Sequence, residues 1–420
     1  MKNISYFCIV KHLKRDIKKY LALLILLTIS PMMPVFSQSE VVSPDTSTGM
    51  DRPDFDPMDS VEVSLLTCSP HEEVYSLYGH TALRWHNIGQ TASGAPEDYV
   101  FNWGSFSFDA PFFVLRFVFG LTDYELATTP LNYFNAYYKQ WGSSVTEQVL
   151  NLTPQEKRKI QQALGINLMP ENRVYRYNYF YDNCSTRPRD IIERCLDGKL
   201  EYQPREDYSP SYREMIHECT RNHPWARFGN DMLLGIRADQ PTDRAQQEFL
   251  PANLMYDFDH AQLYANGEYR PLVKERRLLV PPGVQVVEQD FPVAPLTVFI
   301  CLLAVCVVIS ILEWRRHKTY KYWDALLMLA QGLAGCVLFV MIFSQHPTTS
   351  LNLQLLLLNP LPLFFIPSVL KRKQPSRWWI ILLTMIVLFA IGGIFQTYAE
   401  GMMVLALCLL TRYMSHYKNA

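Results

Sequence analysis

Five apolar stretches fill the last third of the chain, and long segments of this kind are stable only inside a bilayer or a large core. They lie near residues 293–313, 323–343, 351–370, 377–397 and 401–413. The first, second and fourth have about the 20 residues that a helix needs to cross a bilayer. The third is interrupted by Asn359, Pro360 and Pro362, and the fifth is short. The sequence therefore predicts an all-helical membrane domain of about five transmembrane helices over residues 291–420.

Basic residues are distributed unevenly over the loops between these stretches. WRRHK follows the first stretch, KRKQPSR separates the third and fourth, and RYMSHYK follows the fifth. The other two loops, SQHPTTSLN and QTYAEG, carry no Lys or Arg. Because short loops rich in Lys and Arg stay in the cytoplasm, residues 61–290 are predicted to lie outside it.

The N-terminal segment predicts the same orientation. Several lysines precede the apolar run LALLILLTIS, and this order is typical of a secretory signal sequence. We expect residues 1–37 to be a signal sequence, either cleaved before Gln38 or retained as an anchor helix. Residues 38–60 are rich in Ser, Asp and Pro and are interpreted as a linker. The outer domain then spans residues 61–290, and we expect it at the periplasmic face of the inner membrane.

Charge and cysteine usage exclude some classes of function. The net charge is −1 and no long basic run exists, which argues against a nucleic-acid partner. The outer domain has Cys68, Cys184, Cys195 and Cys219, with no CxxC or CxxH pair among them. A structural zinc site is therefore not expected, and neither is a cofactor. In an oxidising compartment these thiols could pair, and Cys195 with Cys219 is the most plausible disulfide.

Cys184 lies in the polar segment YDNCSTRPRD, which is unusual for a cysteine that only packs in a core. Apolar residues at helical spacing follow it, so it is predicted to lie at or just before a helix N-terminus. There the unsatisfied N–H groups, the helix dipole and nearby arginines would favour a thiolate. Backbone N–H groups at the same place could hold an oxyanion. We interpret Cys184 as a nucleophile; the alternative is that it belongs to a disulfide.

A thiolate nucleophile needs a base, and His80 is the first candidate. It begins HTALRWHN, which alternates like a strand, and a histidine on a strand facing a cysteine at a helix start is typical of papain-like enzymes. His86 lies on the same predicted face and is the reserve candidate. Asn102 and, less well, Asp109 could orient the imidazole, because an amide suffices for this role in papain-like sites.

Three further features indicate a lipid-like substrate. Residues 110–121 (APFFVLRFVFGL) could be a core helix or could line an acyl-chain pocket, and the tyrosine-rich RVYRYNYFYDN could form an amphipathic wall. His346, Asn352 and Asn359 lie near the predicted outer ends of membrane segments, where polar residues are functional candidates or simply part of a loop rim.

The segments YGHTALRW, FNWGSF and YDNCSTRPRD, followed by a multi-helix anchor, resemble the Lnb-type lipoprotein N-acyltransferases of diderm bacteria. The resemblance implies an α+β fold, with a permuted papain-like periplasmic domain in which the histidine precedes the cysteine. The lecithin:retinol acyltransferase family shares that order and has an Asn-Cys pair similar to Asn183 and Cys184. The resemblance implies that Cys184 carries the acyl group and that His80 is the base. Arg187, Arg84, Tyr78 and Asn183 are the residues that we expect to bind substrate.

Three functions are compatible with these features, and the resemblance favours the first of them. The first is transfer of an acyl chain from phospholipid, through a Cys184 thioester, to the α-amine of the lipid-modified N-terminal cysteine of a lipoprotein. The second is a membrane-anchored peptidase or amidase that uses the same residues on cell-wall peptide. The third is a non-enzymatic sensor or scaffold in which Cys184 is structural.

Overall fold

The computed structural model describes residues 56–71, 73–89, 97–105, 112, 116–117, 119–285, 291–371 and 378–419. The predicted signal sequence (1–37), most of the predicted linker (38–60) and the alternative acid Asp109 lie outside the described residues.

The N-terminal part is built on a seven-stranded antiparallel sheet with the strand order β10-β5-β1-β2-β3-β4-β6. The strands are β1 (Val61–Cys68), β2 (His80–Asn87), β3 (Glu97–Ser105), β4 (Asp123–Pro130), β5 (Val145–Leu150), β6 (Val174–Arg176) and β10 (Val273–Val280). β1 is central and nearly every side chain on it is buried, which explains why VEVSLLTC lacks a strict polar alternation. The predicted strand beginning at His80 is confirmed as β2.

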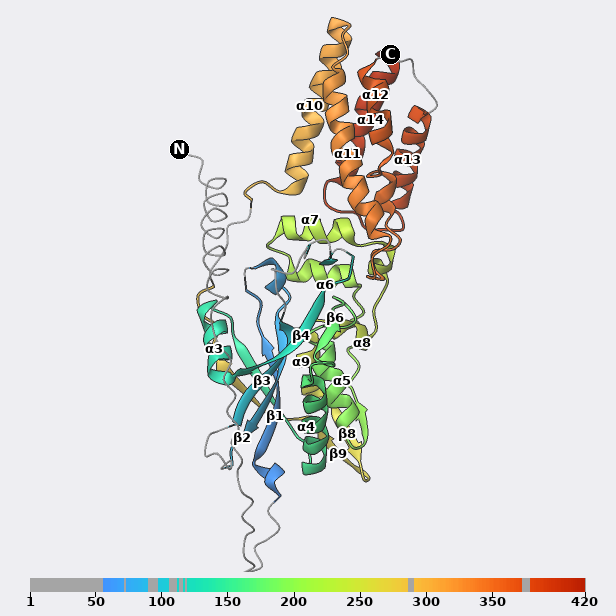
Figure 1. Cartoon of the computed structure of the whole chain (residues 1–420). Helices are drawn as coiled ribbons and strands as arrows, with labels where there is room; N and C mark the ends of the chain where they lie inside the picture. Colours follow the sequence, from blue (N-terminus) through green and yellow to red (C-terminus); the bar gives the residue numbers. More distant parts are fainter. Residues whose placement is uncertain are drawn as a thin grey trace, which may run out of the picture. The chain divides into compact units, whose positions relative to one another are not determined.

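Helices cover both faces of this sheet (Figure 1). On one face, α3 (Leu131–Gln140) packs Phe134 and Tyr138 against the strands. On the other face lie α4 (Pro154–Leu168), α5 (Thr186–Cys195) and α9 (Pro251–His260), which enclose the main core around Trp103. Because α5 is held in that core, the residues just before it are fixed against the sheet. The smaller elements are η1 (Pro57–Ser60), η2 (Val74–Ser76), α6 (Tyr212–Cys219), α7 (Pro224–Leu233), η3 (Ile236–Asp239), α8 (Arg244–Gln247) and a three-stranded sheet of β7 (Lys199–Glu201), β8 (Gln262–Ala265) and β9 (Glu268–Pro271).

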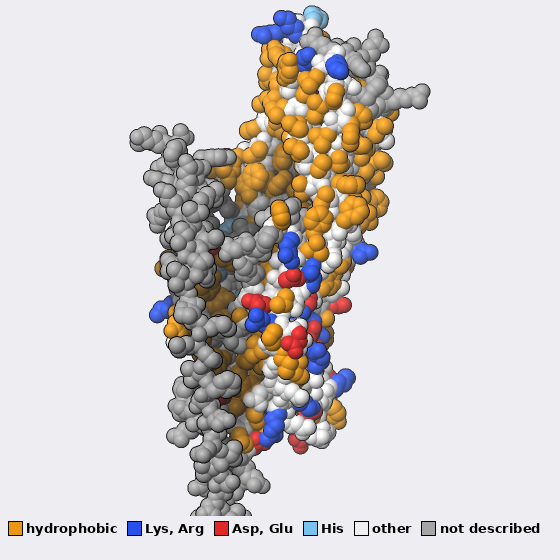
Figure 2. All heavy atoms as spheres, viewed as in Figure 1, with side chains coloured by type: hydrophobic (Ala, Val, Ile, Leu, Met, Phe, Trp, Pro, Cys, Tyr) orange, Lys and Arg blue, Asp and Glu red, His pale blue; other side chains and the backbone are white. Residues whose placement is uncertain are grey.

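The C-terminal part is helical. Its elements are α10 (Pro295–Arg316), α11 (Lys321–Met341), η4 (Leu353–Leu356), α12 (Leu361–Leu370), α13 (Trp378–Gly392) and α14 (Met402–Asn419). Figure 2 shows hydrophobic side chains over the visible face of these helices, with Lys and Arg gathered at the far end, where α10 ends at Arg315 and Arg316. The chain is therefore mixed α/β, with a sheet-rich N-terminal domain and a helical C-terminal part.

The lengths of the apolar helices differ from the expectation in one respect. Within the described residues, three segments are long and apolar enough to cross a bilayer: Pro295–Arg316, Lys321–Met341 and Leu353–Leu370. The third was the stretch interrupted by Asn359 and two prolines; η4 and α12 together supply its length. The fourth and fifth stretches form shorter apolar helices, Trp379–Gly392 and Met402–Ser415. Five spans therefore remain a prediction, and three meet the length criterion.

The segment around α7 is hydrogen-bonded to the loop that follows α11. The backbone N–H of Gly235 donates to the Thr348 carbonyl at 2.8 Å, and the Asn352 side chain donates to the Met232 carbonyl at 2.8 Å. A Cβ at Gly235 would lie 2.2 Å from the Leu351 carbonyl oxygen, so the two backbones can approach only because this residue is glycine. These bonds join the helical part directly to the domain that holds Cys184.

Candidate active site

Cys184 lies in the turn just before α5, as predicted, and Asn183 holds that turn in place. The Asn183 side-chain oxygen accepts from the backbone N–H groups of Ser185 (2.8 Å) and Thr186 (3.0 Å). Its amide nitrogen donates to the carbonyls of Tyr179 and Phe249, both at 2.9 Å. All of these hydrogen bonds are internal, and Asn183 is buried. Asn183 thus lines the site but acts as a helix cap rather than as a substrate ligand.

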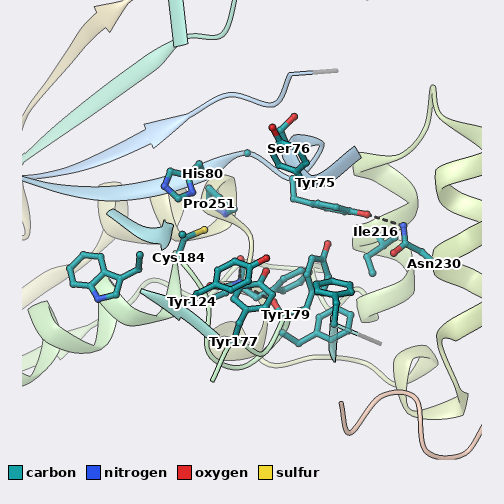
Figure 3. A pocket seen from close by; sticks show the side chains of 18 of the residues that line it. Tyr75, Ser76, His80, Tyr124, Tyr177, Tyr179, Cys184, Ile216, Asn230 and Pro251 are labelled. Atoms are coloured by element: carbon teal, nitrogen blue, oxygen red, sulfur yellow. Dashed lines mark hydrogen bonds between the residues drawn. The ribbon is translucent and has the colours of Figure 1, made fainter. Parts of the chain in front are cut away.

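His80 begins β2 and faces Cys184 from the sheet (Figure 3). Its Nε2 is 2.8 Å from the Oδ1 of Asn102 on the neighbouring strand β3. Because an amide oxygen can only accept, Nε2 carries the hydrogen in the neutral ring and Nδ1 remains for proton exchange with the thiol. Gly104 packs against the imidazole, since a Cβ there would lie 2.9 Å from His80 Cε1. The structure thus brings Cys184, His80 and Asn102 together.

Electrostatics favour the thiolate–imidazolium form of this pair. Burial alone would raise the pKa of Cys184, but the charge of His80 and its hydrogen bond to the sulfur outweigh it, and the Thr81 N–H and Ser185 add hydrogen bonds. The pKa of Cys184 is therefore lowered from its ordinary value. Burial would lower the pKa of His80, but Cys184 and the bond to Asn102 raise it overall. A thiolate with an adjacent imidazolium is the reactive form of a cysteine nucleophile.

The two arginines expected to assist the thiolate are engaged elsewhere. Arg187 forms a bidentate ion pair with Asp182 (2.6 and 2.8 Å) and stacks over the Tyr175 ring. Arg189 pairs with Asp190 and the buried Glu248. Each positive charge is neutralised locally, so the lowered pKa of the thiol comes from the imidazole and hydrogen bonds instead.

Arg84 also differs from the expectation of substrate binding. Its guanidinium is buried and bonded to Asp98 and Glu147, in each case at 2.7 Å at the closest approach. Neither Arg84 nor Arg187 lines the cavity described below, so we remove both from the substrate-binding set. The reserve base, His86, is on the same strand as His80 but outside the cavity, with its Nδ1 3.8 Å from Glu62.

Cys184 and His80 open into a cavity of about 640 Å³. Its wall is mainly aromatic and apolar, and among the described lining residues none is Lys, Arg, Asp or Glu. The aromatic members are Tyr75, Tyr78, Trp103, Phe117, Tyr124, Tyr137, Tyr138, Tyr177, Tyr179, Phe180 and Phe249. The wall continues to Met341 at the end of α11 and to His346, Thr348 and Thr349 in the loop after it. One cavity, with no Lys, Arg, Asp or Glu among its described lining residues, therefore runs from the thiol to the outer part of the helical domain.

Several predicted residues line this cavity. Tyr78 does so, with its hydroxyl accepting from the Asn230 side chain at 2.9 Å, and burial raises the pKa of that hydroxyl to about 12. Phe117, from the apolar segment 110–121, is a lining residue, as is His346. Asn352 and Asn359, by contrast, make structural hydrogen bonds in and near the helical domain.

Sequence reasoning missed several residues of the wall. Tyr124 and Asn230 come from β4 and α7, and Phe249 comes from the end of the loop before α9. None stands in a motif, and each reaches the cavity only through tertiary packing. Tyr177 and Tyr179 lie in the tyrosine-rich segment that was predicted to form an amphipathic wall.

Two family models match the chain, one for each part. The Lnb N-terminal periplasmic domain matches residues 54–218, which include Cys184, His80 and Asn102. The Lnb transmembrane domain matches residues 287–420. The chain belongs to the Lnb family. No curated protein and no solved structure matches it.

Membership in the Lnb family confirms the resemblance found in the three sequence segments. This Lnb-family protein is a membrane protein with a periplasmic domain. Membership in this family also makes it a membrane-associated periplasmic enzyme of lipoprotein processing.

Proposed function

We propose that this Lnb-family protein is a lipoprotein N-acyltransferase that uses Cys184 as its nucleophile. The observation that carries the proposal is the largely aromatic cavity that joins the thiol to the loop after α11. None of its described lining residues is Lys, Arg, Asp or Glu. Apolar and aromatic walls bind an acyl chain through burial of its surface, at about 0.8 kcal/mol for each buried methylene group. A thiol nucleophile at one end of such a cavity is suited to attack a lipid ester.

The first half-reaction loads the enzyme. The Cys184 thiolate attacks the carbonyl carbon of a phospholipid ester, and the carbonyl electrons move onto oxygen. The tetrahedral intermediate collapses with loss of the lysophospholipid alkoxide, which takes the proton held by the His80 imidazolium. A Cys184 thioester remains, and Asn102 keeps the imidazole oriented during the transfer.

The second half-reaction passes the chain to the lipoprotein. The α-amine of the lipid-modified N-terminal cysteine attacks the thioester carbonyl, and His80 takes a proton from the amine. Collapse expels the Cys184 thiolate and leaves an amide on the acceptor. Both substrates are anchored in a membrane, which explains why a cavity continuous with the membrane domain is useful. No cofactor or metal is needed for either step.

The proposal also includes the fold of the periplasmic domain, the membrane topology and the acyl donor. The periplasmic domain is a permuted papain-like fold, supported by a histidine strand that precedes a cysteine at a helix start. The protein resides in the inner membrane with five spans, supported by five apolar helices and by basic residues at the end of α10. The acyl donor is a phospholipid of the outer face of that membrane.

A peptidase or amidase acting on cell-wall peptide is the second candidate, and the same dyad could perform that chemistry. Cell-wall peptides carry free carboxylates and amines, which a specific site would be expected to pair with charged side chains. Among the described lining residues there is no Lys, Arg, Asp or Glu, and burial lowers the pKa of His71 and His346, the two lining histidines other than His80. This observation favours the acyltransferase.

The test is detection of the acyl-enzyme. Purified protein incubated with phospholipid alone should gain the mass of one fatty acyl chain on Cys184, and neutral hydroxylamine should remove it. A diacylated lipopeptide with a free α-amine should discharge the thioester, whereas an N-blocked lipopeptide should not. Cys195→Ala, at the C-terminal end of α5 and away from the cavity, is the matched control for Cys184→Ala. Peptide cleavage without acyl loading would instead support the second candidate.

A further inference from the structure

An acyl transfer through a thioester requires hydrogen-bond donors for the oxyanion, and the turn around Cys184 limits where they can come from. The N–H groups of Ser185 and Thr186 are taken by the Asn183 side chain, and the Asn183 N–H donates to the Thr186 hydroxyl at 2.9 Å. The Thr81 N–H is directed at the sulfur. These four groups are therefore not available to the substrate carbonyl.

The backbone N–H of Cys184 itself is different. No acceptor for it exists within the part of the chain that the structure describes. Buried backbone N–H groups are almost always paired, so an unpaired one next to a nucleophile is a ready donor for a ligand. One donor is rarely enough, because an oxyanion is usually held by two.

Tyr177 offers the second donor. Its ring stacks on Tyr124 with centroids 4.1 Å apart and planes 16° from parallel, which fixes its orientation. Both rings line the cavity on the side of Cys184 (Figure 3), and the charge of Cys184 contributes to the raised pKa of each hydroxyl. Among the described residues, none forms a hydrogen bond with the Tyr177 hydroxyl. The Tyr179 hydroxyl is unpaired among them as well, but its electrostatic neighbours are Tyr78, Tyr177 and Cys219, whereas Cys184 is a neighbour of Tyr177. Tyr177 therefore has a rigid ring and a hydroxyl left for a ligand.

We propose that Tyr177 is a catalytic residue whose hydroxyl, together with the Cys184 N–H, holds the acyl carbonyl oxygen while the tetrahedral intermediate exists. This inference rests on the proposed function, since it assigns the oxyanion site of that acyl transfer. The carbonyl oxygen gains negative charge when the thiolate attacks and loses it when the alkoxide or thiolate leaves. Tyr177 donates a hydrogen bond throughout and transfers no proton.

The environment of Tyr177 keeps its hydroxyl in the form that can donate. Burial, and then the neighbouring Tyr124 and Cys184, raise the pKa of Tyr177 well above its ordinary value. The phenol is therefore neutral near neutral pH, where the lowered pKa of Cys184 favours its thiolate. A neutral donor in a largely aromatic cavity stabilises an oxyanion more strongly than it stabilises the uncharged ester, as catalysis requires.

The experiment compares acylation with alkylation of the same thiol in the full-length protein. Acylation by phospholipid passes through an oxyanion, whereas alkylation by iodoacetamide does not. Tyr177→Phe keeps the stacked ring and removes only the hydroxyl. We expect its single-turnover rate of acyl loading to fall by about 100-fold, the usual effect of deleting one oxyanion donor. The rate and pH profile of iodoacetamide alkylation should equal those of the wild type. Tyr212→Phe removes from α6, outside the cavity, a buried hydroxyl that is unpaired among the described residues, and should load at the wild-type rate.

The outcomes separate this inference from the proposed function. If wild-type protein takes no acyl group from phospholipid, the proposed function fails and this inference fails with it. If the wild type loads and Tyr177→Phe loads equally fast, only the oxyanion role of Tyr177 is overturned. A parallel loss of acylation and alkylation in Tyr177→Phe would also overturn it, because the residue would then act by positioning Cys184.

Discussion

Replacing Gly104 by alanine is expected to move the His80 imidazole without unfolding the protein. A Cβ at this position would lie 2.9 Å from His80 Cε1 and 3.3 Å from Asn102 Oδ1. Ordinary van der Waals contact begins at 3.4 Å, so the imidazole must shift by about 0.5 Å or more. The atom that must move, His80 Cε1, belongs to a side chain rather than to the backbone. Alanine also tolerates strand geometry, so the free energy of unfolding should change little.

The effect on activity should be larger than the effect on stability. Misplacement of a catalytic group by about 1 Å can cost on the order of 100-fold in rate, so a shift of about half that size should cost roughly 10-fold. We expect the acyl-loading rate of Gly104→Ala to fall by about that factor. The pH profile of Cys184 alkylation should move to higher pH, because the displaced imidazole stabilises the thiolate less.

A second glycine gives the matched control. Gly165 lies in α4, and a Cβ there would meet nothing within 4 Å. Gly165→Ala should therefore leave acyl loading unchanged and stabilise the protein by about 0.5–1 kcal/mol through its higher helix propensity. Both variants would be compared by loading rate and by thermal unfolding in detergent. If Gly104→Ala loads like the wild type, strand β3 does not set the position of His80, and the reasoning fails.

Three further outcomes are expected. Because His80 lowers the pKa of the Cys184 thiol, alkylation of Cys184 should be half-maximal at a pH below the ordinary thiol pKa. In His80→Ala the effect of burial dominates, so the pH profile of alkylation should shift to higher pH. An unshifted profile would contradict the pairing of His80 with Cys184. Arg84→Ala leaves the fully buried Glu147 with only the longer contact to Arg277, at 3.8 Å, and should cost about 3 kcal/mol in unfolding free energy. Chemical denaturation measures this, and an unchanged midpoint would show that the Arg84–Glu147 ion pair does not stabilise the fold. A reporter active only outside the cytoplasm should be active when fused after residue 285 and silent in the loop between α10 and α11; the reverse pattern would overturn the proposed topology.

The membrane helices, the position of Cys184 and strand β2 can all be predicted from short stretches of the sequence. The membrane helices follow from apolar runs, because a bilayer selects segments by length and composition alone. Cys184 could be recognised because a cysteine among polar residues before a helical pattern has few structural explanations. β2 could be recognised because period-two alternation is a local property. In each case the evidence lies within about 20 consecutive residues.

The roles of polar side chains required the tertiary structure. The sequence could not decide between Asn102 and Asp109 as the partner of His80; the structure places Asn102 Oδ1 at 2.8 Å, and Asp109 lies outside the described residues. Arg84 was expected to bind substrate, but its buried partner Glu147 lies 63 positions away along the chain. A charge next to a motif carries no information about which distant carboxylate will neutralise it.

The cavity likewise exists only in the folded chain. Its wall combines β2, β3, β4, the turn before α5, the segment around α7 and the loop after α11. Tyrosines are common on strands and in cores, so neither Tyr124 nor Tyr177 stands out in sequence. Their stacking next to an unpaired Cys184 N–H results from antiparallel pairing of β4 with β6 and from packing of α5 against the sheet. Local chemistry thus identifies the nucleophile, whereas long-range pairing decides which groups surround the bond that it attacks.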